Sequence, residues 1–125
     1  MVKRIAVLMV LVFLILCSCK DKKNVFTVDQ NRVSVKTGDE FILKIISNHS
    51  TGYKWMEETT IDTQFLQLKL VDYIINNKNT DGGGGYEYWH FKALNKGETV
   101  VKLKYVQPFE DLPPDKMVNF KIIIE

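Results

Sequence analysis

From residue 25 onward the chain alternates apolar and polar side chains with a period of two, and this pattern constrains the fold most. Successive side chains of a β-strand point to opposite faces, so the alternation predicts strands with one dry face and one solvated face. The clearest inward-facing sets are Phe41, Leu43 and Ile45; Trp89, Phe91 and Ala93; and Val101, Leu103 and Tyr105. We find no internal repeat and no amphipathic helix in this part of the chain.

Turn-forming residues separate the strands at short intervals. The expected strand segments are 25–28, 32–36, 41–45, 53–56, 65–75, 88–93, 101–105 and 118–124. Only the stretch 57–70 is ambiguous, because it could hold a short helical turn before the strand begins. About seven to eight strands in roughly 100 residues predict an all-β chain with an immunoglobulin-like β-sandwich.

A segment of a different kind precedes this pattern. Lys3 and Arg4 are followed by an unbroken apolar run from Ile5 to Cys17. That run is too short to span the ~30 Å core of a bilayer comfortably, and it is typical of a secretory signal peptide.

The end of the apolar run resembles the lipidation signal of bacterial lipoproteins, with Leu16 three places before Cys19 and small residues between them. Cleavage in such signals falls directly before the lipidated cysteine. Cys19 fits better than Cys17, because Cys17 would place the bulky Leu16 before the cut. The alternative is an ordinary signal peptide whose cysteines are incidental. The expected organisation is a signal peptide at 1–18, a lipid-anchored tether at 19–24 and a single β domain at 25–125, in a bacterial cell envelope.

The charge balance narrows the range of partners. The whole chain has 17 basic and 15 acidic side chains, and cleavage before Cys19 removes Lys3 and Arg4 and leaves 15 of each. A neutral mature chain argues against nucleic acid as a partner, and membrane attachment would come from the lipid. The two histidines lie far apart and no Cys/His cluster has zinc-like spacing, so we expect no metal. We also expect no cofactor, and we expect the protein to be a monomer.

Three loops break the alternation and are the candidate functional segments. Gly52 in the first can take a positive φ, the glycine run of the second removes all side chains, and Pro108 in the third presents Phe109 to solvent. Taken singly, each could be an ordinary strand connection. The loop residues are Asn48, His49, Ser50, Thr51, Gly52 and Tyr53; Gly82, Gly83, Gly84 and Gly85; and Gln107, Pro108 and Phe109.

In this order the three loops resemble the motifs of the chagasin family, which are protein inhibitors of papain-like cysteine proteases. The first family motif is Asn-Pro-Thr-Thr-Gly-Tyr/Phe, which here reads Asn48-His49-Ser50-Thr51-Gly52-Tyr53. The second is Gly-x-Gly-Gly, which the glycine run satisfies. The third is Arg-Pro-Trp, which here reads Gln107-Pro108-Phe109. The resemblance extends over about residues 32–125.

The resemblance implies an immunoglobulin-like sandwich with the three loops side by side at one end. They would fill the cleft of a protease reversibly, with Thr51 and Gly52 nearest to its catalytic residues. Arg and Trp are frequent interface hot spots, so Gln107 and Phe109 in their places predict weaker or narrower inhibition. His49 in place of Pro would loosen the central loop slightly.

Two other functions remain open at this point. An immunoglobulin-like lipoprotein for adhesion or glycan binding could use Tyr86, Tyr88, Trp89 and Phe109 as an aromatic platform. A hydrolase could use His49 with Ser50, or His90. Adjacent side chains seldom meet in triad geometry, and no acidic residue that would orient the histidine is evident, so we expect no enzyme.

Overall fold

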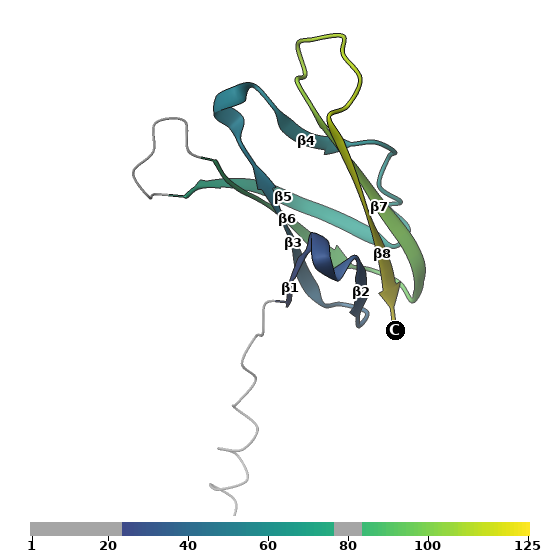
Figure 1. Cartoon of the computed structure of the whole chain (residues 1–125). Helices are drawn as coiled ribbons and strands as arrows, with labels where there is room; N and C mark the ends of the chain where they lie inside the picture. The colour runs from purple at the N-terminus through teal and green to yellow at the C-terminus, as the bar shows by residue number, and fades with distance from the viewer. Residues whose placement is uncertain (1–23, 77–83) are drawn as a thin grey trace, which may run out of the picture.

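Nearly all regular structure in the chain is β-strand. The computed structural model describes residues 24–76 and 84–125. The expected signal peptide, the predicted lipidation site Cys19, and Gly82 and Gly83 lie outside the described residues. The strands are β1 (Asn24–Thr27), β2 (Arg32–Val35), β3 (Glu40–Ser47), β4 (Lys54–Glu57), β5 (Leu66–Ile75), β6 (Gly85–Ala93), β7 (Gly97–Val106) and β8 (Lys116–Ile124) (Figure 1). Two single 3₁₀ turns, η1 (Val28–Gln30) and η2 (His49–Thr51), complete the described structure.

The strands form two four-stranded sheets that face one another. One sheet has the order β1-β3-β6-β5 and the other β2-β8-β7-β4. The chain crosses between them early, because β1 pairs in parallel with β3 whereas β2 pairs in parallel with β8. The prediction of an immunoglobulin-like β-sandwich is confirmed. Most strand boundaries differ from expectation by one or two residues, and β5 begins at Leu66 after a turn at 63–65. The largest differences are at β6, which begins at Gly85 and not at Tyr88, and at β7, which begins at Gly97 and not at Val101.

The core lies between the sheets and consists of the side chains that the alternation placed inward. All nine residues of the three clearest sets are buried. Phe41 and Phe91 stack at the centre of the first sheet, with ring centroids 5.4 Å apart. Phe120, Ile122 and Ile124 of β8 close the core from the second sheet. Burial of these side chains supplies the main driving force for folding.

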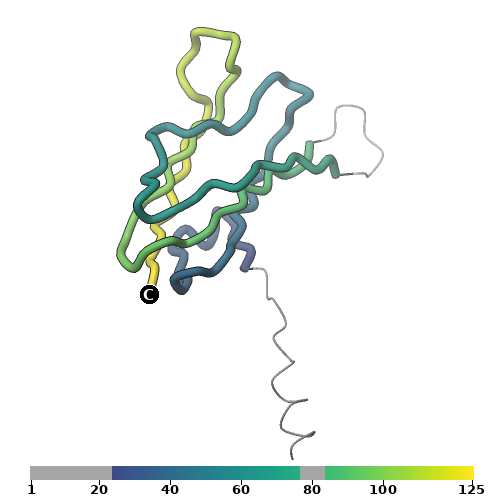
Figure 2. Tube along the Cα trace, turned by 180° about the vertical axis from the view of Figure 1, so that it is seen from behind, coloured from purple at the N-terminus to yellow at the C-terminus, as the bar shows by residue number. Residues whose placement is uncertain are grey.

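The strand directions bring the candidate loops to one end of the sandwich. In the first sheet Gly85 is paired with both Ser47 and Ile75, so β3 ends, β5 ends and β6 starts at the same level. In the second sheet Lys54 is paired with Val106, so β4 starts where β7 ends. Figures 1 and 2 show the β3–β4 and β7–β8 connections side by side, away from the C-terminus.

A β-bulge in β5 changes which of its side chains face inward. The register against β6 shifts between Leu68 and Leu70, which inserts Lys69 as an extra residue. Before the bulge Leu66 and Leu68 face the core, and after it Tyr73 is paired with Glu87 on the inner side. The bulge therefore turns the Tyr73 side chain to the inner side of the sheet, near the loop end of the sandwich.

Within residues 24–76 and 84–125, no helix is long and apolar enough to cross a membrane.

We predict that Phe41→Ala lowers the free energy of unfolding by about 3–5 kcal/mol, because it removes a buried aromatic ring from the centre of the core. Ile46→Ala is the matched control, since Ile46 lies on the same strand but is 64% exposed. It should cost less than about 1 kcal/mol. Urea unfolding followed by tryptophan fluorescence measures both. Equal losses would contradict the assignment of the two faces of β3.

Candidate functional site

The central loop, residues 48–53, is closed by its own side chains. The Asn48 Oδ1 atom accepts hydrogen bonds from the Ser50 N–H at 3.1 Å and the Ser50 hydroxyl at 2.5 Å. The Thr51 hydroxyl donates to the Asn48 carbonyl at 2.7 Å. Gly52 ends the turn with a φ of +81°, the left-handed conformation that glycine adopts without strain. These bonds give the loop a defined shape in the free protein.

Two tyrosines from the sandwich support the central loop from below. The Asn48 N–H donates to the Tyr105 hydroxyl at 2.8 Å, and the His49 N–H donates to the Tyr73 hydroxyl at 3.3 Å. The His49 ring also stacks on the Tyr73 ring, with centroids 3.6 Å apart. Tyr53 stacks on Tyr105 at 5.1 Å. Because Tyr73 lies on β5 and Tyr105 on β7, the loop is bound to both sheets.

The third loop contacts the central loop directly. Gln107 Nε2 donates a hydrogen bond to the Thr51 carbonyl at 3.1 Å, and the same nitrogen lies nearest to the open side of Gly52. Gln107 is half-buried, whereas Phe109 is 100% exposed. The predicted exposure of Phe109 is confirmed. The part played by Gln107 in holding the central loop was not predicted, because the sequence does not show which loop its amide reaches.

The two described glycines of the second loop differ in role. Gly84 lies against the base of the central loop, since a Cβ there would sit 3.2 Å from the Ser47 carbonyl oxygen. Gly85 is instead a buried residue of β6, where a Cβ would meet the Ile74 carbonyl oxygen at 2.1 Å. The prediction that Gly85 belongs to the open loop is therefore corrected: close contact with β5 requires glycine at this position.

The aromatic platform of the adhesion hypothesis is not assembled. Trp89 is 4% exposed and faces the core, whereas Tyr86 and Tyr88 lie on the outer face of β6 beside Lys44. Phe109 belongs to the β7–β8 connection at the loop end. These aromatic side chains point to different surfaces, so the prediction of a shared binding surface is wrong.

The side chains of the hydrolase hypothesis have other partners. The Ser50 hydroxyl donates to the Asn48 Oδ1 atom at 2.5 Å, and the His49 Nε2 atom lies against Glu87. The expectation that His49 has no acidic neighbour is nevertheless wrong, because its Nε2 atom lies 3.1 Å from the Glu87 carboxylate. His90 is paired with Asp72 at 3.2 Å on the outer face of the first sheet.

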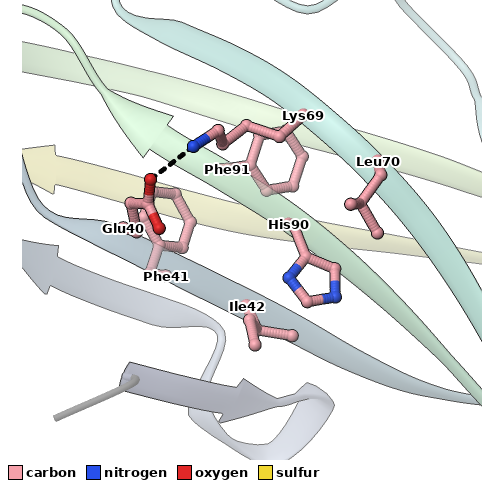
Figure 3. A pocket seen from close by; sticks show the side chains of 7 residues that line it. All are labelled: Glu40, Phe41, Ile42, Lys69, Leu70, His90 and Phe91. Atoms are coloured by element: carbon pink, nitrogen blue, oxygen red, sulfur yellow. Dashed lines mark hydrogen bonds and ion pairs between the residues drawn. The ribbon is translucent and has the colours of Figure 1, made fainter. Parts of the chain in front are cut away.

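A small hollow lies beside His90, remote from the loops (Figure 3). Its volume is about 150 Å³, and Ile42, Leu70 and the ion pair between Lys69 and Glu40 line it together with the core phenylalanines. The ion pair between Lys69 and Glu40 is exposed. The Nε2 atom of His90 is buried and lies 3.2 Å from the Asp72 carboxylate, without the geometry of a hydrogen bond. In the described part of the chain, no three His, Cys, Asp or Glu side chains lie close enough to hold a metal ion.

Comparison with known proteins identifies the family. The model of the chagasin family peptidase inhibitor I42 matches residues 34–124. The chain belongs to the chagasin family. This makes it a peptidase inhibitor and not an enzyme. No curated protein sequence matches it at a significant level.

Solved structures show the same chagasin-family fold. The cysteine protease inhibitor EhICP2 from Entamoeba histolytica superimposes with a TM-score of 0.68 at 21% identity, over 82% of this chain and 95% of that one. Amebosin gives a TM-score of 0.66 at 20% identity, over 83% of this chain and 99% of that one.

Three residues that support the loops of this chagasin-family member were missed by the sequence analysis: Tyr73, Tyr105 and Glu87. Tyr105 was identified only as a core residue. Glu87 could have been found, because it occupies an inward position in the alternation Glu87, Trp89, Phe91. An acidic residue at such a position requires a set of hydrogen-bond donors around it.

We predict that Gly85→Ala lowers the free energy of unfolding by about 1–3 kcal/mol, because the added Cβ forces β5 and β6 apart. Gly84→Ala is the control and should cost less, since its closest contact at 3.2 Å needs only a small shift. Urea unfolding of both variants measures the difference. Greater destabilisation by Gly84→Ala would contradict the packing described for Gly85.

Proposed function

We propose that the domain inhibits papain-like cysteine proteases reversibly. The central loop would enter the active-site cleft, and the second and third loops would contact its walls. The observation that carries this proposal is the hydrogen bond from Gln107 to the Thr51 carbonyl, which joins the central and third loops into one surface. The exposed ring of Phe109 lies on the same third loop, next to Pro108.

The conformation of the central loop favours inhibition over cleavage. Residues 49–51 form a 3₁₀ turn, so their peptide bonds are not presented as an extended strand. The Asn48, Ser50 and Thr51 side chains bond within the loop, which lowers the ordering cost of binding. A rigid, narrow loop of this kind can cover a nucleophile without offering it a bond in substrate geometry.

The papain-like class of the target is supported by the three loop motifs and by the similarity of the fold to EhICP2, which is a cysteine protease inhibitor. In the third motif, two positions depart from the family pattern. Gln107 lacks the charge of Arg, and Phe109 lacks the indole N–H of Trp. An interface of about 1,600 Å² is expected for such a pair, and a few anchors such as Phe109 would supply most of its affinity.

We predict that the domain, residues 24–125, inhibits papain, and that Phe109→Ala weakens binding by about 1–3 kcal/mol because it removes an aromatic anchor. Val100→Ala is the control, since Val100 is a partly exposed apolar residue on β7 away from the loops. Gly52→Trp should abolish most of the inhibition. The inhibition constants of the variants, compared beside thermal melts, test the ranking. If Phe109→Ala and Gly52→Trp inhibit as wild type does, the loops are not the interface.

A second measurement separates an inhibitor from a slow substrate. Incubation with excess papain and subsequent intact-mass analysis should show an uncut chain. Cleavage within residues 48–53 would contradict the proposed binding mode, because it would require the loop to open into an extended strand.

We also propose that a lipid on Cys19 attaches the protein to a membrane of a bacterial cell envelope. The support is the sequence alone: the apolar run, and the short Leu16-to-Cys19 signal that follows it. Cys19→Ser should move the protein from the membrane pellet to the soluble fraction after a carbonate wash. Cys17→Ser is the matched control and should leave the protein in the pellet. A Cys19→Ser protein that still pellets would disprove lipid attachment at this residue.

A further inference from the structure

The most unusual polar group in the sandwich is the carboxylate of Glu87, which is 2% exposed. Three donors contact its Oε2 atom: the Ser47 hydroxyl at 2.7 Å, the Trp55 N–H at 3.0 Å and the His49 Nε2 atom at 3.1 Å. Its Oε1 atom accepts from the Trp89 indole N–H at 3.2 Å. The carboxylate thus connects β3, β4, β6 and the central loop.

The donor set selects a carboxylate over an amide. The Trp55 main-chain N–H and the Trp89 indole N–H can only donate, and they contact different oxygens of Glu87. A glutamine has only one oxygen, so its amino group would face one of these N–H groups without forming a bond. An acidic side chain is therefore required by the geometry, and its burial is offset by four hydrogen bonds.

His49 contributes a ring nitrogen to the Glu87 carboxylate and is the only member of the set that belongs to the central loop. Among the described residues, no other basic side chain is paired with Glu87. Tyr73 on β5 also contacts His49, through its ring and its hydroxyl, and the His49 carbonyl accepts a hydrogen bond from the Gly52 N–H at 3.1 Å. Ser47, Trp55 and Trp89 lie on strands, so their bonds to Glu87 hold the sandwich together independently of the loop.

We propose that Glu87 is the positioning residue of the central loop. Its carboxylate is fixed by the strands, binds the His49 side chain from below, and so holds residues 48–53 in their binding conformation before the protease arrives. This inference rests on the proposed function. It also explains how the loop remains ordered although His49 stands where the family motif has proline: a side-chain bond to the sandwich replaces the rigidity of the proline ring.

The inference is specific enough to be separated from a purely structural role. The His49 side chain is 34% exposed, so truncating it removes the loop's bond to Glu87 without leaving a large cavity in the core. His90 offers a matched control, because it is the only other histidine of the chain and also lies beside a carboxylate, that of Asp72. Its pair is on the outer face, away from the loops.

The test is a double-mutant cycle with His49→Ala, Glu87→Gln and the double variant, with His90→Ala as control. We expect His49→Ala to raise the inhibition constant for papain roughly tenfold, with little change in the thermal melt. In the Glu87→Gln background, His49→Ala should have a clearly smaller further effect, because a neutral amide binds the His49 side chain more weakly than the carboxylate does. His90→Ala should inhibit as wild type does. If Glu87→Gln does not fold, Glu87→Asp replaces it, because it keeps the charge but withdraws the carboxylate from His49.

Two results would overturn the inference. An unchanged inhibition constant for His49→Ala means that the loop does not depend on this bond. Equal losses from His49→Ala in both backgrounds mean that His49 contacts the protease itself. Amide hydrogen exchange of residues 49–52 in the free protein provides a readout without protease, and it should be faster in His49→Ala than in His90→Ala. If wild type fails to inhibit papain, the proposed function fails, while this exchange measurement still decides whether Glu87 positions the loop.

Discussion

The antiparallel pairing of β3 with β6 determines where the central loop, the second loop and Glu87 lie relative to one another. It runs from Glu40 opposite Lys92 to Ser47 opposite Gly85, through the middle of the first sheet. Because Ser47 and Gly85 are paired, the central loop and the end of the glycine run leave the sheet at the same level. The same register pairs Glu87 with Ile45, which precedes the first residue of the central loop, Asn48, on the same chain segment. A shift by one residue would move Glu87 to the outer face and remove the support of the loop.

The sequence predicts the sandwich well because alternation is a local property. Phe41, Leu43 and Ile45 need only their own spacing to be placed in the core, and Phe109 needs only its position after Pro108 to be placed in solvent. Tyr73 could not be placed in this way. The bulge at Lys69 reverses the alternation of β5, and the bulge depends on pairing with a strand distant in sequence. The contact of Gln107 with the central loop was not predicted for the same reason, since its partner Thr51 lies 56 residues away in the sequence.

Three positions that depart from the family motifs, His49, Ser50 and Gln107, make side-chain contacts that hold the central loop. His49 bonds to Glu87 and stacks on Tyr73, and Gln107 bonds to Thr51. Residues that look like losses when compared with a motif thus contribute to the internal order of the loop. Affinity in such a protein depends on the surface that contacts the partner and also on the conformational entropy that the loops lose on binding. The contacts of His49 and Gln107 reduce this loss of entropy, because they order the central loop before binding.

The parallel pairing of β1 with β3 places the start of β1 at the end of the sandwich remote from the loops. Asn24 lies opposite Phe41, at the end of the first sheet remote from Asn48, and the β3 segment between them spans about 20 Å. The chain therefore enters the domain at one pole and displays its loops at the other. An attachment made through the chain before Asn24 would therefore leave the loop end free to meet a partner.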